Sequence, residues 1–327
     1  MRKTVFSGIQ PTGEIHIGNY LGAIERWVEL ARSQEYFCIF SIVDYHAITV
    51  PYEAKIMKQQ IEKVAAMLMA CGLNEDNCLL FIQSQVPEHT ELAWILNSSC
   101  TMSELARMTQ FKDKSQNKEN TGVGLFTYPV LQTADIILYK ATHVPVGEDQ
   151  LQHLELAREI VRRFNRTFKK VFPEPQPIIG EAKRILGTDG GKKMSKSLNN
   201  TVALSDSSKK MWKKLACAKT DEKRQRREDP GVPTDCNVFM SYHKHFTSQE
   251  EQETIDKKCR NAEFGCVDCK KILAKNMEEK LGPIRKKYEQ ILSDPTELHN
   301  FLEKSAKKCK EMAEKNMQQV RKAIGLR

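Results

Sequence analysis

The sequence has no apolar run long enough to cross a bilayer, for which a helix needs about 20 apolar residues. Its opening residues also lack the long apolar stretch and the small-residue cleavage site of a secretory signal. We therefore expect a cytoplasmic protein that makes no membrane contact. Because cytosolic thiols stay reduced, the ten cysteines do not predict a disulfide scaffold. No internal repeat is recognisable.

Acidic residues are in short supply in only one part of the chain. Residues 1–200 carry 23 Lys or Arg and 22 Asp or Glu, whereas residues 201–327 carry 28 and 20. Nearly all of the net charge of +9 therefore lies in the second part. A basic part beside a neutral part favours docking of a polyanion. Lysine-rich helices that only keep the surface solvated would produce the same excess.

Strand-like segments are confined to the first 200 residues. Apolar runs at 36–43 and 78–82 are typical of strands buried on both faces, and helical patterns at 18–30 and 53–71 alternate with them. This βαβ alternation predicts an α/β fold with a parallel sheet, followed by an all-helical region. The remaining expected elements are a strand running into a turn at 5–11, helices at 88–110, 129–140, 150–164, 212–218, 249–258, 270–280, 284–292 and 296–324, a strand end at 144–147 and a proline-punctuated connection at 173–177.

Glycines gather in the turn after the first predicted strand, at Gly8, Gly13 and Gly18. Glycine lets a ligand approach the backbone without a Cβ clash, and the N-terminus of a helix attracts phosphate. His16 and Asn19 could each donate a hydrogen bond to a phosphate oxygen. The turn is thus a candidate nucleotide site, although a Gly/Pro turn capped by a polar residue would have the same composition.

A second candidate for phosphate binding lies far along the chain, at 193–197. Its two ammonium groups, Lys193 and Lys196, suit the charge that develops on a leaving pyrophosphate. Glycines at 187, 190 and 191 would allow this loop to move, and the spacing is not that of a Walker P-loop. Taken alone, the segment is more simply a solvated lysine cluster. Its pairing with the glycine turn favours a functional role.

Six segments stand in a fixed order along the chain: Phe6–Gly13, Met108–Lys112, Tyr128–Pro129, Ala134–Tyr139, Val144–Gln150 and Lys193–Ser197. This set resembles the class I aminoacyl-tRNA synthetases, and in particular the bacterial-type tryptophanyl-tRNA synthetases, across essentially the whole chain. The resemblance implies a Rossmann-like catalytic domain that makes tryptophanyl-adenylate and pyrophosphate from L-tryptophan and ATP with Mg²⁺. The tryptophanyl group would then pass to tRNA(Trp).

The resemblance implies that ATP is held from two sides and covered by the lysine loop. Gln10, Lys193, Ser195 and Lys196 are the implied catalytic residues, because they would stabilise charge at the reacting phosphates. The full implied ATP-binding set is Gln10, Pro11, Thr12, His16, Gly18, Asn19, Gly147, Glu148, Asp149, Ile185, Lys193, Met194, Ser195, Lys196 and Ser197.

Asp135 is the implied reader of the indole ring. An indole N–H is a donor with no acceptor function, and a carboxylate within an otherwise apolar helix would accept from it. A surface aspartate at Asp135 and a packed core histidine at His46 are the simpler alternatives. Gln132 stands where many relatives have methionine, which leaves the choice between tryptophan and tyrosine less sharp. The other implied tryptophan-binding residues are Tyr128, Gln150 and His46 at the α-ammonium and carboxylate groups, Phe6, Val144 and Val146 as pocket walls, and Gln132 beside them.

Four cysteines, Cys236, Cys259, Cys266 and Cys269, have the spacing Cys-x22-Cys-x6-Cys-x2-Cys. Four thiolates can bind Zn²⁺ or hold a [4Fe–4S] cluster, and spacing does not choose between them. A subset of bacterial tryptophanyl-tRNA synthetases shares this pattern and carries [4Fe–4S], so the resemblance implies iron–sulfur, with Zn²⁺ as the alternative. We expect the group to staple loops near an anticodon-binding surface. The other cysteines are expected only to pack; they are Cys38, Cys71, Cys78, Cys100, Cys217 and Cys309.

The resemblance also implies two domains and a homodimer. Residues 1–200 would form the catalytic domain, with a helical insertion at about 88–140 that supplies the dimer interface and a mobile lysine loop at 187–200. Residues 201–327 would form a basic, helical domain that binds the anticodon. A tyrosyl-tRNA synthetase, a non-catalytic RNA-binding relative and a small nucleotidyltransferase remain alternatives. The basic candidates for anticodon contact are Lys307, Lys308, Lys310, Arg321 and Lys322.

Overall fold

The computed structural model describes residues 2–109, 111, 122–147, 150–180, 185–191, 193–195 and 198–326. Within them, five parallel strands form one sheet in the order β3-β2-β1-β4-β5. The predicted α/β fold with a parallel sheet is therefore confirmed. The strands are β1 (Lys3–Ile9), β2 (Tyr36–Ile42), β3 (Leu79–Ile82), β4 (His143–Val146) and β5 (Gln176–Ile179).

The direction in which the sheet is built reverses between β1 and β4. β1 pairs with β2 along its whole length, from Lys3 opposite Tyr36 to Ile9 opposite Ile42, and meets β4 on its other edge. The chain thus adds strands first to one side of β1 and then to the other. In open parallel sheets, ligands bind beyond the carboxyl ends of the strands at such a point. The residues that follow β1 and β4 include several of those implied for ATP.

β5 lies where the sequence predicts only a proline-punctuated connection. Pro177 stands opposite Val144 in the parallel pairing of β4 and β5. A proline cannot donate to a ladder and is tolerated at the edge of a sheet, and β5 is the edge strand. The prediction of a connection alone was therefore wrong, because the segment includes the start of an edge strand.

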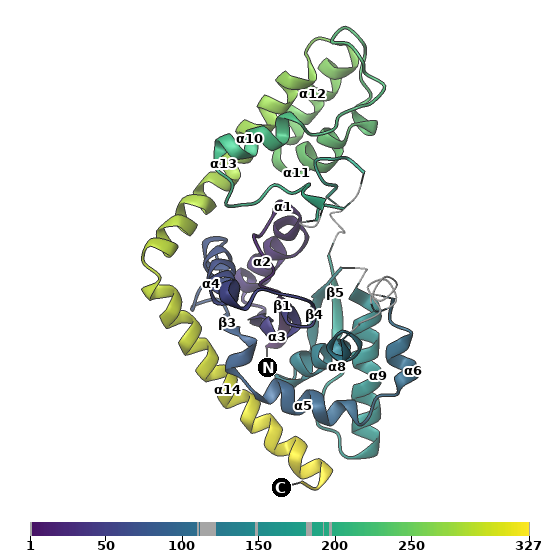
Figure 1. The fold of residues 1–327 in the computed structure, drawn as a ribbon, viewed down its shortest axis with the longest axis vertical. Coiled ribbons are helices and arrows are strands. Elements are labelled where there is room, and N and C mark those ends of the chain that lie inside the picture. The colour runs from purple at the N-terminus through teal and green to yellow at the C-terminus, as the bar shows by residue number, and fades with distance from the viewer. Residues whose placement is uncertain are drawn as a thin grey trace. The chain divides into compact units, whose positions relative to one another are not determined.

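Helices pack around this sheet, and α14 runs past β3 and α5 (Figure 1). Its apolar stripe, which the sequence predicts, is buried and includes Leu298, Phe301, Cys309 and Val320. The helices of this unit are α2 (Glu25–Ser33), α3 (Asp44–Ala47), α4 (Ala54–Ala70), α5 (Glu88–Asn97), α6 (Met102–Ala106), α8 (Val123–Leu138), α9 (Leu151–Thr167) and α14 (Thr296–Ile324).

The chain divides into two compact units, and the division differs from the expected boundary at residue 200. The first unit contains the sheet, and the segment from Asp294 onward belongs to it. Arg321 forms two hydrogen bonds to Glu91, at 2.8 and 2.6 Å, and Asn316 donates to the Leu138 carbonyl at 2.8 Å. Because its buried face completes the core beside the sheet, α14 belongs with the strands and not with the helical region.

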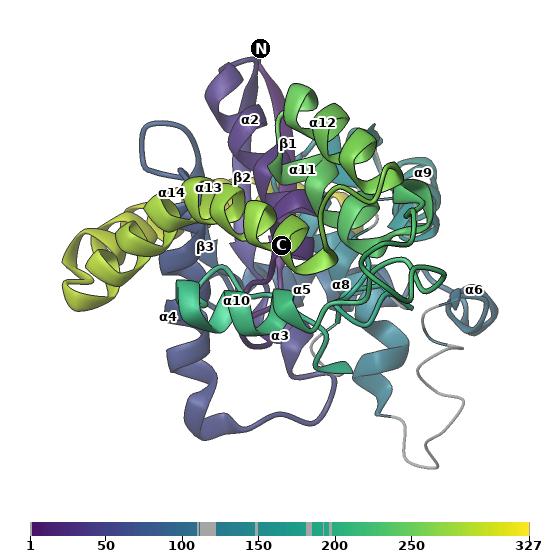
Figure 2. The ribbon, with the colours of Figure 1, turned by 90° about the horizontal axis from the view of Figure 1, so that it is seen from above.

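The second unit joins Gly13–Ile24 to Lys183–Ser293 and is helical, as the scarcity of strand signals predicts. Figure 2 shows its larger helices from above. No described helix in either unit combines the length and the apolarity that crossing a membrane requires. The elements of this unit are α1 (Ile17–Asn19), η1 (Tyr20–Ile24), α10 (Ser208–Ala216), η5 (Pro233–Asp235), η6 (Val238–His243), α11 (Lys244–Phe246), α12 (Gln249–Arg260) and α13 (Cys266–Ser293).

α13 is one helix where the sequence predicts two. It continues through Pro283, although an interior proline removes a backbone hydrogen bond. The buried Arg285 guanidinium, just after the proline, bonds to Glu278, which precedes the proline. It also donates to the Asp206 carbonyl at 2.6 Å. The contact with Asp206, which lies outside the helix, offsets part of this local penalty.

Candidate active site

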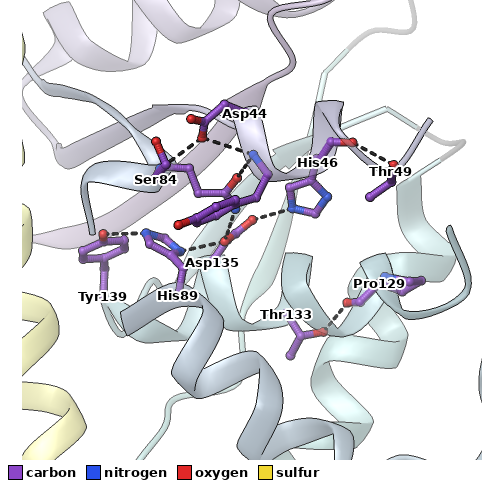
Figure 3. A network of polar contacts seen from close by, with 11 residues as sticks. Asp44, His46, Thr49, Ser84, His89, Pro129, Thr133, Asp135 and Tyr139 are labelled. Atoms are coloured by element: carbon purple, nitrogen blue, oxygen red, sulfur yellow. Dashed lines mark hydrogen bonds and ion pairs between the residues drawn. The ribbon is translucent and has the colours of Figure 1, made fainter. Parts of the chain in front are cut away.

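Asp135 is the centre of a buried polar network in the sheet-containing unit (Figure 3). It lies on α8 and is only 2% exposed. His46 Nε2 lies 2.7 Å from Asp135 Oδ2, while Gln83 Nε2 and His89 Nδ1 each lie 2.7 Å from Oδ1. The alternative that Asp135 is a surface residue is therefore excluded.

The network keeps the Asp135 carboxylate ionised. Burial alone would raise the pKa of Asp135, but the charge and hydrogen bonds of His46 and His89 outweigh it, and the pKa lies well below its usual 3.8. An ionised carboxylate only accepts hydrogen bonds. Among the described residues, Oδ2 has one hydrogen-bond partner and Oδ1 has two. Oδ2 can therefore accept another hydrogen bond, of the kind an indole N–H donates.

His89 links Asp135 to Tyr139 through its two ring nitrogens. Its Nδ1 must donate, because ionised Asp135 can only accept. Its Nε2 lies 2.8 Å from the Tyr139 hydroxyl, and burial raises the pKa of Tyr139 well above its usual range, so this hydroxyl keeps its proton. The His89 ring therefore bridges the Tyr139 hydroxyl and the Asp135 carboxylate, and its Nδ1 donates to Asp135.

The sequence motifs do not point to Gln83 or His89. Gln83 directly follows β3, and its Oε1 accepts the Tyr45 N–H at 3.1 Å, so it ties α3 to the carboxyl end of that strand. A polar residue at the end of a buried parallel strand is a usable signal for a site. His89 lies in the first turn of α5 and is fully buried. Nothing in the local sequence distinguishes it from an exposed helix histidine.

Three of the implied tryptophan-binding residues share one face of α8, since Tyr128, Gln132 and Asp135 are spaced four and three apart. The Tyr128 ring stands edge-on to His46 at 6.3 Å, and its hydroxyl lies 2.6 Å from His153 Nε2. Burial raises the pKa of Tyr128 to about 12, so its hydroxyl stays protonated.

The remaining implied pocket residues lie in the same unit as Asp135. Phe6 and Val144 are buried on the adjacent strands β1 and β4, and the Phe6 ring stacks on Tyr139 with centroids 5.7 Å apart. Val146 and Gln150, at and after the end of β4, are half-buried.

The glycine turn and the lysine loop (187–200) meet within the second unit. His16 caps α1, with its Nδ1 accepting the Asn19 N–H at 3.3 Å. The Ile17 N–H donates to the Val202 carbonyl at 2.9 Å, just beyond the loop. A Cβ at Gly18 would lie 3.0 Å from His16 Nδ1 and 3.5 Å from Met194 Cβ, so this position has little room for a side chain. Two segments far apart in sequence are thus brought together.

The other residues implied for ATP fall in three groups. Gln10, Pro11 and Thr12 follow β1 and Gly147 follows β4, all in the sheet-containing unit. Ile185, Lys193, Met194 and Ser195 lie in the second unit, where the Met194 N–H donates to the Ile185 carbonyl at 3.1 Å and Lys193 is exposed. Glu148, Asp149, Lys196 and Ser197 lie outside the described residues.

The four spaced cysteines lie close enough to influence one another. Burial first, and then the neighbouring thiols Cys236, Cys259 and Cys266, raise the pKa of Cys269 to about 12. All four are free thiols. Cys269 Sγ lies 3.3 Å from His243 Nε2. Over the described ranges, however, no three or more His, Cys, Asp or Glu side chains are already arranged to hold a metal ion. The donor set suits a thiolate-bound metal, whereas its present geometry does not form a ligand shell.

Comparisons with known proteins agree with this fold and these motifs. The family described as tRNA synthetases class I (W and Y) matches residues 2–282. The tryptophan–tRNA ligase of Deinococcus radiodurans is 44% identical over 324 residues, covering 98% of each chain. That of Thermotoga maritima is 41% identical over 327 residues, covering 98% of this chain and 99% of its own. The solved tryptophanyl-tRNA synthetase of Campylobacter jejuni, complexed with ADP and tryptophan, superposes with a TM-score of 0.90 at 34% identity, covering 99% of this chain and 100% of its own.

The parallel sheet with its helical second unit is the Rossmann-like architecture of the class I synthetases. The chain belongs to the family of class I tRNA synthetases for tryptophan and tyrosine.

Proposed function

We propose that this chain is an ATP-dependent ligase that joins L-tryptophan to tRNA(Trp). The observation that carries the proposal is the buried, ionised Asp135, whose Oδ2 can accept the indole N–H. Relatives that are tryptophan–tRNA ligases, at 41% and 44% identity over nearly the whole chain, support the same substrate.

The reaction has two steps. An oxygen of the tryptophan carboxylate attacks the α-phosphorus of ATP, and the bond to the β-phosphate oxygen breaks to release pyrophosphate. A hydroxyl of the terminal tRNA ribose then attacks the acyl carbon and releases AMP. Mg²⁺ accompanies ATP and neutralises part of the triphosphate charge. The chain itself contributes position and charge.

Each implied residue has a role in this scheme. Gln10, Lys193, Ser195 and Lys196 stabilise the charge that develops on the phosphates. The glycine turn around His16 contributes to nucleotide binding within the second unit, and the resemblance assigns a nucleotide contact to Gly147 and the two acidic residues after it in the first. Tyr128, His46 and Gln150 hold the amino acid's ammonium and carboxylate groups. Phe6, Val144, Val146 and Gln132 surround its ring.

Amino-acid-dependent ATP–pyrophosphate exchange tests the proposal. Exchange that requires tryptophan, and is not supported by tyrosine, is the expected result. Exchange with tyrosine would identify the alternative tyrosyl-tRNA synthetase, and no exchange with any amino acid would identify a non-catalytic RNA-binding relative. The half-buried Gln132 beside the pocket makes the tyrosine arm of this assay necessary.

We also propose a [4Fe–4S] cluster at the four cysteines, with Zn²⁺ as the alternative occupant. Their shared location and lack of disulfides support a thiolate site that forms when the metal binds. Protein purified under nitrogen is expected to show the visible absorption of an iron–sulfur cluster and to contain about four irons per chain. Colourless protein with one zinc per chain would favour the alternative. Protein with neither metal would contradict the proposal.

A homodimer through the segment 88–140 is a further part of the proposal. Three large apolar side chains in that segment are strongly exposed: Trp94 (78%), Met102 (74%) and Val123 (75%). Aromatic residues and methionine are enriched at protein interfaces relative to the rest of the surface. Trp94→Asp is expected to convert a dimer into a monomer in light scattering. Phe168→Asp, at an exposed apolar residue outside the segment, should leave the dimer intact.

tRNA binding by the basic part of the chain completes the proposed function. Lys307, Lys308 and Lys310 are exposed on α14 and remain candidates for contact with tRNA. Arg321 is different, because its ion pairs with Glu91 and Glu314 give it a structural role. We also propose that the protein acts in the cytoplasm, where tRNA is charged for protein synthesis.

A further inference from the structure

A π-helical turn, η6, holds the segment 185–188, which we call the base of the lysine loop. The Tyr242 hydroxyl donates to the Leu186 carbonyl at 2.9 Å, and Asn237 Nδ2 donates to the Gly187 carbonyl at 2.9 Å. Tyr242 is fully buried and Asn237 is 8% exposed. Two buried side-chain donors thus bind consecutive carbonyl groups of the loop base.

The π-helical geometry explains why both side chains reach the loop. Asn237 precedes η6 and Tyr242 lies five residues later. In an α-helix, side chains five residues apart point about 140° away from each other. The wider i→i+5 turn brings them back towards one face. The Ser241 hydroxyl donates to Asn237 Oδ1 at 2.8 Å and so leaves the amide nitrogen to serve as the donor to the loop.

The loop base is in turn bonded to the segment that carries Lys193. Leu186 and Lys193 form an antiparallel bridge, and the Met194 N–H donates to the Ile185 carbonyl at 3.1 Å. Met194 lies beside Gly18 of the glycine turn. The position of Lys193 therefore depends on where residues 185–187 are held.

A buried asparagine, Asn200, fixes the other end of the same loop. Its Oδ1 accepts the Ser195 N–H at 2.8 Å, and its Nδ2 donates to Asp189 at 3.0 Å. Its carbonyl accepts the Thr188 N–H at 3.0 Å. These bonds join the two sides of the loop, so that a shift of the base at 185–188 moves both sides together.

We propose that Asn237 and Tyr242 are positioning residues for adenylate formation, holding the loop base so that Lys193 stands beside the glycine turn. The inference rests on the proposed function. Cys236 lies two residues before η6, and its carbonyl accepts the Met240 N–H of that turn at 2.9 Å. The cysteine-bearing segment and the lysine loop are therefore one connected structure, which the motifs alone do not reveal.

Two near-isosteric variants test the proposal in the full-length protein. Tyr242→Phe removes one hydroxyl from a packed ring, and Asn237→Asp keeps the acceptor for Ser241 but removes the donor to Gly187. Loss of one buried hydrogen bond is expected to lower kcat for tryptophan-dependent pyrophosphate exchange by about 5- to 10-fold. The KM for tryptophan should stay within about twofold of wild type, because Asp135 belongs to the other unit. Tyr288→Phe, in α13, is the matched control and should behave as wild type.

Hydrogen–deuterium exchange gives a readout that does not depend on activity. The amides of Thr188 and Met194 should exchange faster in Tyr242→Phe, while α10 exchanges as in wild type. Faster exchange throughout the unit, or an equal loss of tryptophan binding, would show a merely structural role and overturn the inference. Variants indistinguishable from wild type in both measurements would overturn it too, while leaving the proposed function intact. A wild-type protein that shows no amino-acid-dependent ATP–pyrophosphate exchange would instead refute the proposed function.

Discussion

Replacing Asp135 with asparagine is the sharpest perturbation of the proposed tryptophan site. The two side chains have nearly the same shape, so the packing of α8 is preserved. Three donors, from His46, Gln83 and His89, converge on the carboxylate within 2.7 Å. An amide has one acceptor oxygen, and its NH₂ group would face at least one of these donors.

The size of the effect follows from the bonds that are lost. A hydrogen bond to a charged group contributes about 1.5–3 kcal/mol, and a buried donor left without a partner costs about 1–3 kcal/mol. Together they predict a loss of about 2.5–6 kcal/mol, or about 10²- to 10⁴-fold in kcat/KM for tryptophan. The loss should appear in the KM for tryptophan, with the KM for ATP almost unchanged.

Pyrophosphate exchange at varied tryptophan and at varied ATP measures both constants. Asp221→Asn is the matched control, since Asp221 is also buried but accepts backbone N–H groups in the second unit. It should reduce stability without changing the KM for tryptophan. A KM for tryptophan in Asp135→Asn within about threefold of wild type would refute the argument that this carboxylate reads the indole ring.

Four further outcomes follow from the structure. Tyr139→Phe removes the hydroxyl that bonds to His89 Nε2 and should raise the KM for tryptophan about 3- to 10-fold. His89→Ala should raise the pKa of Asp135 and make that KM pH-dependent in mildly acidic solution; a flat pH profile would contradict this role of His89. Arg163 bonds lower the pKa of Glu104 to about 2, so this pair stabilises the fold above the carboxyl's usual 4.5 and the benefit is lost as pH falls towards 2. Glu104→Gln should therefore reduce the free energy of unfolding by about 1 kcal/mol at pH 7 and by nothing near pH 2, measured by urea titration. A Cβ at Gly187 would lie 2.0 Å from Asn200 Nδ2, whereas one at Gly191 meets nothing within 4 Å; Gly187→Ala should lower kcat by about 100-fold and Gly191→Ala should not, and equal activity of the two would exclude tight packing at the loop base.

Much of the fold follows from local patterns. The apolar runs at β2 and β3, the helical periods between them and the stripe on α14 each reflect a repeat of a few residues, which the sequence displays directly. β5 was not predicted because Pro177 is typical of a connection. α13 was predicted as two helices because Pro283 is typical of a helix break. In both cases neighbouring elements supply contacts that outweigh the preference of the proline.

The candidate site divides in the same way. Asp135, the glycine turn and the lysine loop carry their chemistry in their own residue types and order, so the sequence alone determined the family and the reaction to be tested. Only the tertiary structure decided that Gln83, His89 and Tyr139 surround Asp135, that α14 packs with the sheet, and that η6 holds the lysine loop. The physical reason is that these contacts join residues 46 or more positions apart. Such distant pairing depends on how whole elements pack and not on any local repeat.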